Sequence, residues 1–445
     1  MNPPERGGRI SRGLSPADQA RKAAEAAFRI EWPRLVARLT RIIGDIDAAE
    51  DLAQDAMVAA VEQWPRDGVP VNPGGWLMVT ARHRAVDRLR RDATFARKLS
   101  ELGREAAIGD GGETLLADLD LDHAIEDDLL RMIFTTCHPV LSAPARVALT
   151  LRMVGGLTTE EIARAYLVPE STVAQRIVRA KRALAAKRVP FEVPSGPDLA
   201  ARLDSALEVI YLIFNEGYEA SAGDEWVRAE LVEEALRLAR ILTGLMPLEP
   251  EVHGLAALLE LQASRVRARS GPSKALVLLA DQNRSRWDRL LIRRGFAALG
   301  RAQALSHESR QAPGRYALQA AIAAAHAMAF THEETDWRRI AGLYAVLVRR
   351  FPSPIVELNR AVAVAMVEGP GPGLDLVDAV ATTGALNSYH LLHAVRGDML
   401  ARLGRHQEAG ASFTRAAELT SNTVEQLFLR DRASACIRYS HSAPQ

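Results

Sequence analysis

The chain has 445 residues, with 56 lysines and arginines against 55 aspartates and glutamates, and its formal net charge is +1. This near-neutral total excludes a uniformly basic surface, so any contact with nucleic acid must lie in local patches. The length suits about two to four domains. Aromatic residues make up only 5%, and alanine, leucine and arginine dominate, which predicts a nearly all-helical fold.

Cysteine usage and hydropathy point to one compartment. Cys137 and Cys436 are far apart in the sequence and form no Cys-x-x-Cys pair, so neither a disulfide framework nor a zinc ribbon is indicated. The first residues lack the apolar core of a signal peptide, and the most apolar run, residues 317–330, is too short to span a bilayer. We therefore expect a cytoplasmic protein without a membrane anchor.

An acidic helix is predicted close to the beginning of the chain. Residues 1–18 are rich in Gly, Pro, Ser and Arg and are expected to be a flexible tail, and a first helix should begin at Gln19. Between Gly44 and Gln63 there are six acidic residues and no lysine or arginine. Their helical spacing predicts an exposed edge suited to a basic partner. The side chains of this edge are Glu50, Asp51, Gln54 and Asp55.

A basic helix is predicted next, after a loop at residues 65–75. Seven lysines and arginines stand between Trp76 and Lys98, against two aspartates. For each helix in isolation, pairing of the acidic helix with the basic one is the simpler interpretation. The ten acidic residues between Leu99 and Asp128, with Arg104 as the sole cation, predict a flexible, self-repelling connector.

Two further helices are predicted at residues 125–137 and 143–154, followed by a helix-turn-helix at residues 157–184. Thr158 and Glu161 form the Ser/Thr-x-x-Glu signature of a helix start, and Pro169 marks the start of the second helix. In that helix the apolar positions should pack inward, while polar and basic side chains of the kind that reach bases and phosphates point outward. The inward set is Val173, Ile177, Ala180 and Leu184. A solvated helical hairpin of a repeat protein is the alternative interpretation.

The order of these elements resembles the extracytoplasmic-function (ECF) sigma factors of bacterial RNA polymerase over about residues 20–190. DAAEDLAQDAMVAAVEQW resembles the polymerase-binding helix of region two, WLMVTARHRAVDRLRR the helix that engages the promoter −10 element, and residues 157–184 resemble region four. The resemblance implies that Glu50, Asp51, Gln54 and Asp55 bind core polymerase. It also implies that Trp76, Arg82, Arg84, Arg88 and Arg91 act at the −10 element, and Ser171, Thr172, Gln175, Arg176, Arg179, Lys181 and Arg182 at the −35 element.

The chain departs from the family at three places. The 65–75 loop contains no aromatic residue of its own, and His83 stands where the family often has asparagine. Leu167 occupies the interhelical turn where a glycine is common, so the turn cannot rely on glycine's access to positive φ. The bases read at both promoter elements are therefore expected to differ.

Residues 191–445 predict a helical extension without strands. Amphipathic segments follow one another after a Pro/Gly hinge at residues 191–199, and the spacing of small and aromatic residues matches a tetratricopeptide unit. The positions of this unit are Gly397, Gly404, Ala409, Phe413 and Ala416. One group of ECF factors carries such an extension, and the segment YLIFNEGYEAS at residues 211–221 closely resembles part of it. This resemblance implies that the extension is a regulatory module that binds a protein or peptide.

No chemistry-bearing motif is evident in the extension. His390 and His393 share one predicted helix face, and His326 and His332 another, but neither pair has a third ligand at metal spacing, so we expect no metal and no cofactor. Phosphate loops, nucleophile elbows and His-Glu-x-x-His motifs do not occur in the sequence. We therefore expect that the chain is not an enzyme.

The predicted protein is all-α, with two small helical sigma domains followed by an α-solenoid. Its predicted parts are a tail (1–18), region two (19–98), a linker (99–124), region four (125–190) and the extension (191–445). Its expected partners are core polymerase and promoter DNA. The first alternative is a helix-turn-helix activator with a repeat-type sensor, which would not need the acidic helix. The second is a small-molecule enzyme or sensor within the extension.

Overall fold

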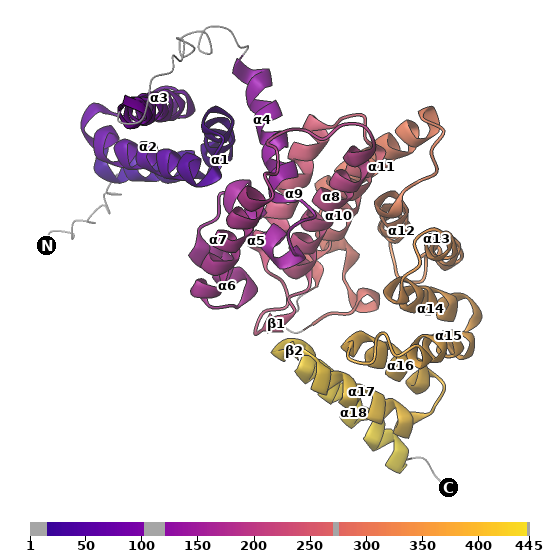
Figure 1. The fold of residues 1–445 in the computed structure, drawn as a ribbon. Helices are drawn as coiled ribbons and strands as arrows, with labels where there is room; N and C mark the ends of the chain where they lie inside the picture. The colour runs from indigo at the N-terminus through magenta and orange to yellow at the C-terminus, as the bar shows by residue number, and fades with distance from the viewer. Residues whose placement is uncertain (1–15, 102–120, 270–275, 443–445) are drawn as a thin grey trace, which may run out of the picture. The chain divides into compact units, whose positions relative to one another are not determined.

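The computed structural model describes residues 16–101, 121–269 and 276–442 and confirms that the chain is all-α (Figure 1). Most of the predicted tail and of the predicted linker, at residues 1–15 and 102–120, lie outside this description. The chain divides into two compact units: residues 1–163 with 169–206, and residues 164–168 with 207–445. Each unit is described separately, and the predicted domain boundaries remain predictions. No helix in the described ranges is long and apolar enough to cross a membrane.

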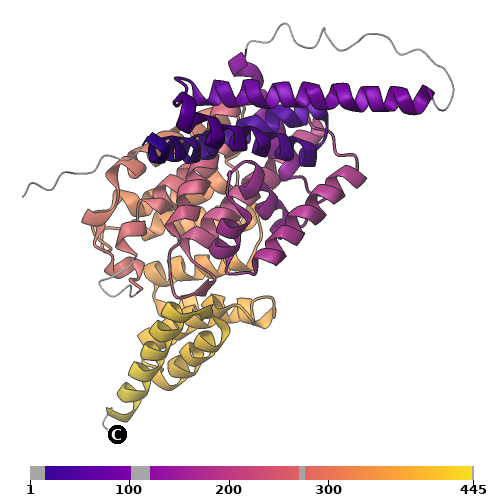
Figure 2. The ribbon, with the colours of Figure 1, turned by 90° about the vertical axis from the view of Figure 1, so that its left-hand side faces the viewer.

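The first unit begins with three helices. They are α1 (Pro16–Ile43), α2 (Ile46–Asp67) and α3 (Pro73–Glu101), and Figure 2 shows α3 as one long helix. Gly44 separates α1 from α2 at a φ of 77°, and the Asp45 carboxylate caps α2 by accepting from the Ala48 N–H at 2.8 Å. The loop between α2 and α3 is shorter than predicted, because Pro65 remains inside α2 and Pro73 starts α3.

The remaining helices of this unit include the predicted helix-turn-helix. They are α4 (Leu121–Thr136), α5 (Ala143–Met153), α6 (Thr159–Tyr166) and α7 (Glu170–Ala186). The capping box is confirmed, because the Thr158 N–H donates to Glu161 Oε2 at 2.8 Å and the Glu161 N–H donates to Thr158 Oγ1 at 3.1 Å. The four apolar positions of α7 are buried as predicted.

A buried carboxylate joins α1 to α4. Asp128 is fully buried and receives the guanidinium groups of Arg38 at 3.0 Å, Arg41 at 3.4 Å and Arg131 at 2.6 Å. The expectation that Asp128 belongs to a solvated, self-repelling connector is therefore wrong. Three cations offset the cost of burying this carboxylate, and it fixes α4 against α1.

The second unit contains the extension. α8 (Pro197–Tyr218) enters it, and the following α-helices are α9 (Ala229–Leu245), α10 (Pro250–Ala263), α11 (Arg289–Glu308), α12 (Arg315–Met328), α13 (Trp337–Arg350), α14 (Pro354–Glu368), α15 (Pro370–Thr382), α16 (His390–Arg402), α17 (His406–Leu419) and α18 (Thr423–Ser442). Short 3₁₀ helices lie at Val266–Ala268, Leu279–Asp281 and Arg284–Arg286.

The expectation of an extension without strands is wrong for four residues. β1 (Ala222–Gly223) pairs in parallel with β2 (Ser421–Asn422), so that the beginning and the end of the extension are joined. The buried Asn422 strengthens the junction, because its Nδ2 donates to Ala220 O at 3.0 Å and to Glu225 O at 2.9 Å. Sequence periodicity does not detect strands of two residues.

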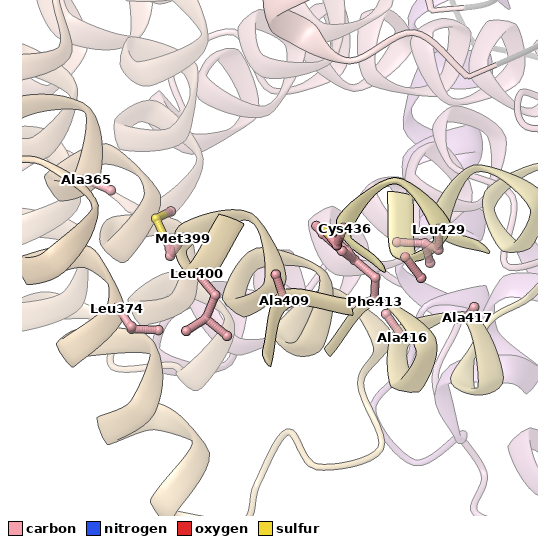
Figure 3. Close-up of a cluster of buried hydrophobic side chains, with 11 residues drawn as sticks. Ala365, Leu374, Met399, Leu400, Ala409, Phe413, Ala416, Ala417, Leu429 and Cys436 are labelled. Atoms are coloured by element: carbon pink, nitrogen blue, oxygen red, sulfur yellow. The ribbon is translucent and has the colours of Figure 1, made fainter. Parts of the chain in front are cut away.

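The last helices pack as consecutive neighbours, with α17 and α18 side by side (Figures 1 and 2). Their core contains Ala409, Phe413 and Ala416, which Figure 3 shows with their neighbours. A Cβ atom on Gly397 would lie 2.9 Å from the Phe413 ring, so the absence of a side chain there lets α16 approach α17. The small residues thus allow neighbouring helices to pack closely, as the repeat pattern predicted. The tetratricopeptide assignment itself remains a prediction.

Candidate nucleic-acid interface

The outer face of α7 carries the polar side chains predicted for DNA reading. Ser171, Gln175, Arg179 and Arg182 are exposed, and Thr172 and Arg176 are partly exposed. Their backbone is held by the buried apolar face of the same helix, which packs against α5. A rigid helix with exposed amide and guanidinium groups matches what a recognition helix presents to base edges and phosphates.

Lys181 is the exception, because the structure places it away from solvent. The residue is 8% exposed, and its ammonium donates to Asp47 Oδ1 at 2.7 Å and to Glu50 Oε2 at 2.5 Å. Burial lowers the pKa of Lys181, but the two carboxylates outweigh burial and raise it above its ordinary value. The expectation that the Lys181 ammonium is exposed for DNA contact is wrong in this conformation, because the ammonium is paired with two carboxylates of α2.

Because of this contact, only part of the acidic edge of α2 is exposed. Asp51, Gln54 and Asp55 are exposed as predicted. The Glu50 carboxylate is 13% exposed, and it binds Arg152 of α5 at 2.5 Å as well as Lys181. The expectation that Glu50 lies on an exposed edge is therefore wrong, while its role in binding polymerase stays a prediction.

Arg152 is a residue that sequence reasoning missed. Its guanidinium lies 5.3 Å from the centre of the Trp32 ring, and its carbonyl accepts from Trp32 Nε1 at 3.2 Å. Arg152 thus ties α5 to both α1 and α2. No local pattern could reveal this, since the Glu50 and Arg152 partners are 102 positions apart.

The predicted −10 surface on α3 is largely accessible. Arg82 is exposed, Arg84 and Arg88 are partly exposed, and the side chain of Arg91 lies outside the described residues. Arg84 approaches Asp55 of α2 at 3.8 Å, with both side chains well exposed, so this pair contributes little to stability. Full pairing of the acidic helix with the basic one is therefore not seen among the described side chains.

Two tryptophans frame the short loop between α2 and α3. The rings of Trp64 and Trp76 lie edge to face with their centres 5.6 Å apart, and Trp64 is 2% exposed. Asn72 caps α3 by accepting from the Gly75 N–H at 2.9 Å. The loop between α2 and α3 therefore lies next to the Trp64–Trp76 pair, although the loop itself contains no aromatic residue.

The turn between α6 and α7 belongs to the second unit. Leu167 adopts a φ of 49°, so the turn takes a positive-φ conformation without a glycine. A Cβ atom on Gly223 of β1 would lie 2.4 Å from Leu167 Cδ1, which shows how closely the leucine covers that glycine. The close contact supports a backbone conformation that is unfavourable for leucine on its own.

Arg228, a residue of the extension, forms hydrogen bonds that hold the end of α6 next to the turn between α6 and α7. Its buried guanidinium donates to Ala165 O, to Glu216 Oε1 at 2.5 Å and to Ala222 O at 2.7 Å. Tyr166 lies beside this pair; burial and the Glu216 charge raise the pKa of its phenol. Sequence patterns did not reveal Arg228, because the contact to Ala165 spans 63 positions.

The four histidines that share predicted helix faces in the extension contact different kinds of partner. His393 Nε2 lies 3.1 Å from Asn387 O, while His390 Nε2 lies 3.0 Å from Glu425 Oε1. His326 and His332 both pack edge to face on Trp337. Burial, followed by the charges of Arg265 and Arg284, lowers the pKa of His326 to about 3.

A hollow of about 380 Å³ opens among α15, α16 and α17. Its lining includes His393, Arg396 and Arg415 together with Glu408 and Ser412. Arg396 is held by Asp378 at 2.7 Å. Ala381, Leu392 and Ala411 also line the hollow, so that polar and apolar side chains are mixed in it.

Comparison with known families assigns both helical regions of the first unit. Residues 28–94 match sigma-70 region 2, and residues 131–184 match sigma-70 region 4. Residues 202–303 match a family of unknown function, DUF6596, which covers α8 to the middle of α11.

Three relatives extend the comparison. An uncharacterized protein of Rhizobium meliloti, R00370, is 43% identical over 408 residues, which cover 89% of this chain and 92% of that protein. The ECF RNA polymerase sigma factor SigK of Mycobacterium ulcerans is 28% identical over 155 residues, 34% of this chain and 78% of SigK. A probable ECF sigma factor of Mycobacterium tuberculosis, SigI, is 27% identical over 168 residues, 38% of this chain and 56% of SigI.

Proposed function

Because this chain belongs to the ECF sigma factors, which bind core RNA polymerase and direct it to promoters, we propose that it cycles between a closed and an open state. The closed state is the one in which Lys181 and Arg152 of region four hold Asp47 and Glu50 of region two. The open state would release both sets of charges, the acidic set to polymerase and the basic set to DNA.

One observation carries this proposal: the Lys181 ammonium lies within 2.7 Å of carboxylates on α2. The −10 and −35 elements are about 25 base pairs apart, which is roughly 85 Å at about 3.4 Å per base pair. A region four packed on region two cannot reach both elements at once. Opening is therefore a required step before promoter recognition.

In the open state, each surface has a defined partner. Asp51, Gln54 and Asp55, joined by the released Glu50, would bind a basic surface of core polymerase. The exposed side chains of α7 would read the −35 element, with Gln175 and Arg176 facing bases and Arg182 facing phosphates. Arg82, Arg84 and Arg88, next to Trp76, would hold the separated −10 strand.

The extension would control the reader through the turn between α6 and α7. Leu167 and Arg228 connect that turn to β1, and β1 connects it to the last helices through β2. A protein or peptide bound to the hollow among α15, α16 and α17 would act through the same connection. We expect the chain itself to catalyse no reaction and to work in the cytoplasm, where polymerase is found.

Charge reversal on α2 tests the polymerase surface. The double substitution Asp51→Arg and Asp55→Arg should weaken binding to core polymerase by at least about tenfold, because both side chains are exposed and the change reverses the charge of the proposed contact surface. The matched control is Glu230→Arg, an exposed acid of α9, which should leave binding unchanged. Equal binding by the double variant and the native chain would refute the assignment of this surface.

A further inference from the structure

Three side chains with metal-binding atoms meet beside the β1–β2 pair. Glu219 follows the last residue of α8, His390 begins α16, and Glu425 lies in the first turn of α18. One ligand atom from each lies within 4.8 Å of the other two. No pattern in the sequence relates these positions, which lie after α8, in α16 and in α18.

The Glu425 carboxylate is held in place by a hydrogen bond from a neighbouring side chain. Glu425 is 5% exposed, and its Oε2 accepts from Thr420 Oγ1 at 2.5 Å. Asn422 joins the two glutamate segments, because it donates to Ala220 O and accepts from the Glu425 N–H at 3.2 Å. A ligand oriented by a second hydrogen bond is typical of metal sites in proteins.

Within the described residues, no hydrogen bond from outside the cluster holds His390 Nε2. His390 Nε2 is buried and lies 3.0 Å from Glu425 Oε1, yet it makes no well-directed hydrogen bond within the described residues. The Glu219 carboxylate has no hydrogen bond or ion pair with any described side chain. Arg269 stacks 3.9 Å over the Tyr218 ring and acts on the Glu219 carboxylate through its charge.

We propose that Glu219, His390 and Glu425 bind a divalent transition-metal ion, for which Zn²⁺ is the reference. One imidazole and two carboxylates are suitable donors, and the two carboxylates match the ion's charge. Neighbouring ligands of a tetrahedral ion with bonds of about 2.0–2.1 Å lie roughly 3.3 Å apart, close to the His390–Glu425 distance. A small rotation of Glu219 would complete three positions, and water would take the fourth.

The ion would cross-link the two ends of the extension. It would join the end of α8 to the starts of α16 and α18, on either side of the β1–β2 pair. Because β1 also contacts Leu167 and Arg228 contacts Ala222, the occupied site would stabilise the segment that holds the reader turn. This consequence rests on the proposed function, whereas metal binding itself does not. The proposal replaces the sequence-based expectation that the chain holds no metal.

Zinc binding to the full-length chain tests the site without polymerase or DNA, so its result is independent of the proposed function. Chelator-treated protein is titrated with Zn²⁺ against a chromophoric chelator, and its melting temperature is recorded with and without the ion. The native chain should bind one equivalent and melt at a higher temperature. Glu219→Gln, His390→Gln and Glu425→Gln should each bind at least about tenfold more weakly.

The matched control is His393→Gln, one turn further along α16, which should bind zinc like the native chain. Far-ultraviolet circular dichroism of the metal-free variants checks that each of them is folded. Unchanged affinity in the three ligand variants would overturn the proposal. So would a native chain whose melting temperature is the same with zinc and with chelator, since the cluster would then be an ion pair between histidine and carboxylates.

Discussion

Lys181 of α7 places its ammonium 2.5 Å from the Glu50 carboxylate of α2, so that a residue predicted to contact DNA neutralises a residue predicted to bind polymerase. The Asp47 carboxylate, at 2.7 Å, completes the contact. Each surface therefore masks part of the other. In the proposed function, stability and activity compete at this contact, because the charges that close the chain are the ones proposed to bind polymerase and DNA.

Removal of the Lys181 ammonium should favour the open state. In Lys181→Ala, the loss of a charge-assisted hydrogen bond of about 1.5 kcal/mol should raise the affinity for core polymerase by roughly tenfold. Fluorescence anisotropy with labelled sigma factor measures this. Arg182→Ala, next in sequence but exposed, is the control and should leave core affinity unchanged. Equal effects of the two substitutions would contradict the closed-state account.

Substitutions on the exposed face of α7 should separate base reading from phosphate binding. Gln175→Ala should lower discrimination at one base pair of the −35 element by about 1–3 kcal/mol. Arg182→Ala should weaken binding to all sequences and lower the salt dependence by about one unit. Binding of the polymerase complex to a series of promoter variants at several salt concentrations distinguishes the two. A sequence-independent loss in Gln175→Ala would remove Gln175 from the base-reading set.

Arg228 should be one of the most sensitive positions in the second unit. Arg228→Met leaves the Glu216 carboxylate without its guanidinium and should cost about 3–5 kcal/mol of unfolding free energy. The double variant with Glu216→Gln should recover part of this loss. Urea unfolding measures both. Arg237→Ala, from a more exposed pair on one helix, is the control and should cost about 0.5 kcal/mol.

His326 should make the second unit sensitive to acid. Its pKa is held at about 3 by burial, well below the ordinary value, so between pH 6.5 and 3 the unfolded chain binds a proton that the folded chain does not. Stability is therefore complete above pH 6.5 and falls as the pH drops towards 3. By linkage, the loss at pH 5 is about 2 kcal/mol.

Unfolding at pH 7.5 and pH 5 checks this effect. The difference between the two pH values should be about 2 kcal/mol smaller in His326→Gln than in the native chain. His307→Gln, an exposed histidine of α11, serves as the control and should behave like the native chain. An identical pH difference in all three proteins would show that His326 is not held neutral.

Local signals in the sequence predicted the helices and the reader. The Thr158–Glu161 capping box and the spacing of Val173, Ile177 and Ala180 involve residues within one or two turns of helix, and the structure confirms them. Loop length was less predictable, because Pro65 reads as a breaker in the sequence but continues α2.

Contacts between distant residues could not be predicted in the same way. Lys181 and Glu50 are 131 positions apart, and each looks like an ordinary exposed charge on an amphipathic helix. The positive φ of Leu167 depends on its cover of Gly223, which no turn preference encodes. Predictions of exposure therefore held where exposure follows from helical periodicity and failed where a second helix packs on the first, while the roles of these residues in binding polymerase and DNA stay predictions.

Crosslinking the closed state tests the central claim most directly. In the double variant Asp47→Cys and Lys181→Cys, a reducible bismaleimide would join α2 to α7, while the native Cys137 and Cys436 are buried. The linked chain should fail to start transcription with core polymerase on a promoter that the unlinked variant uses, and reduction of the linker should restore activity. Full promoter activity in the linked chain would show that opening is not required.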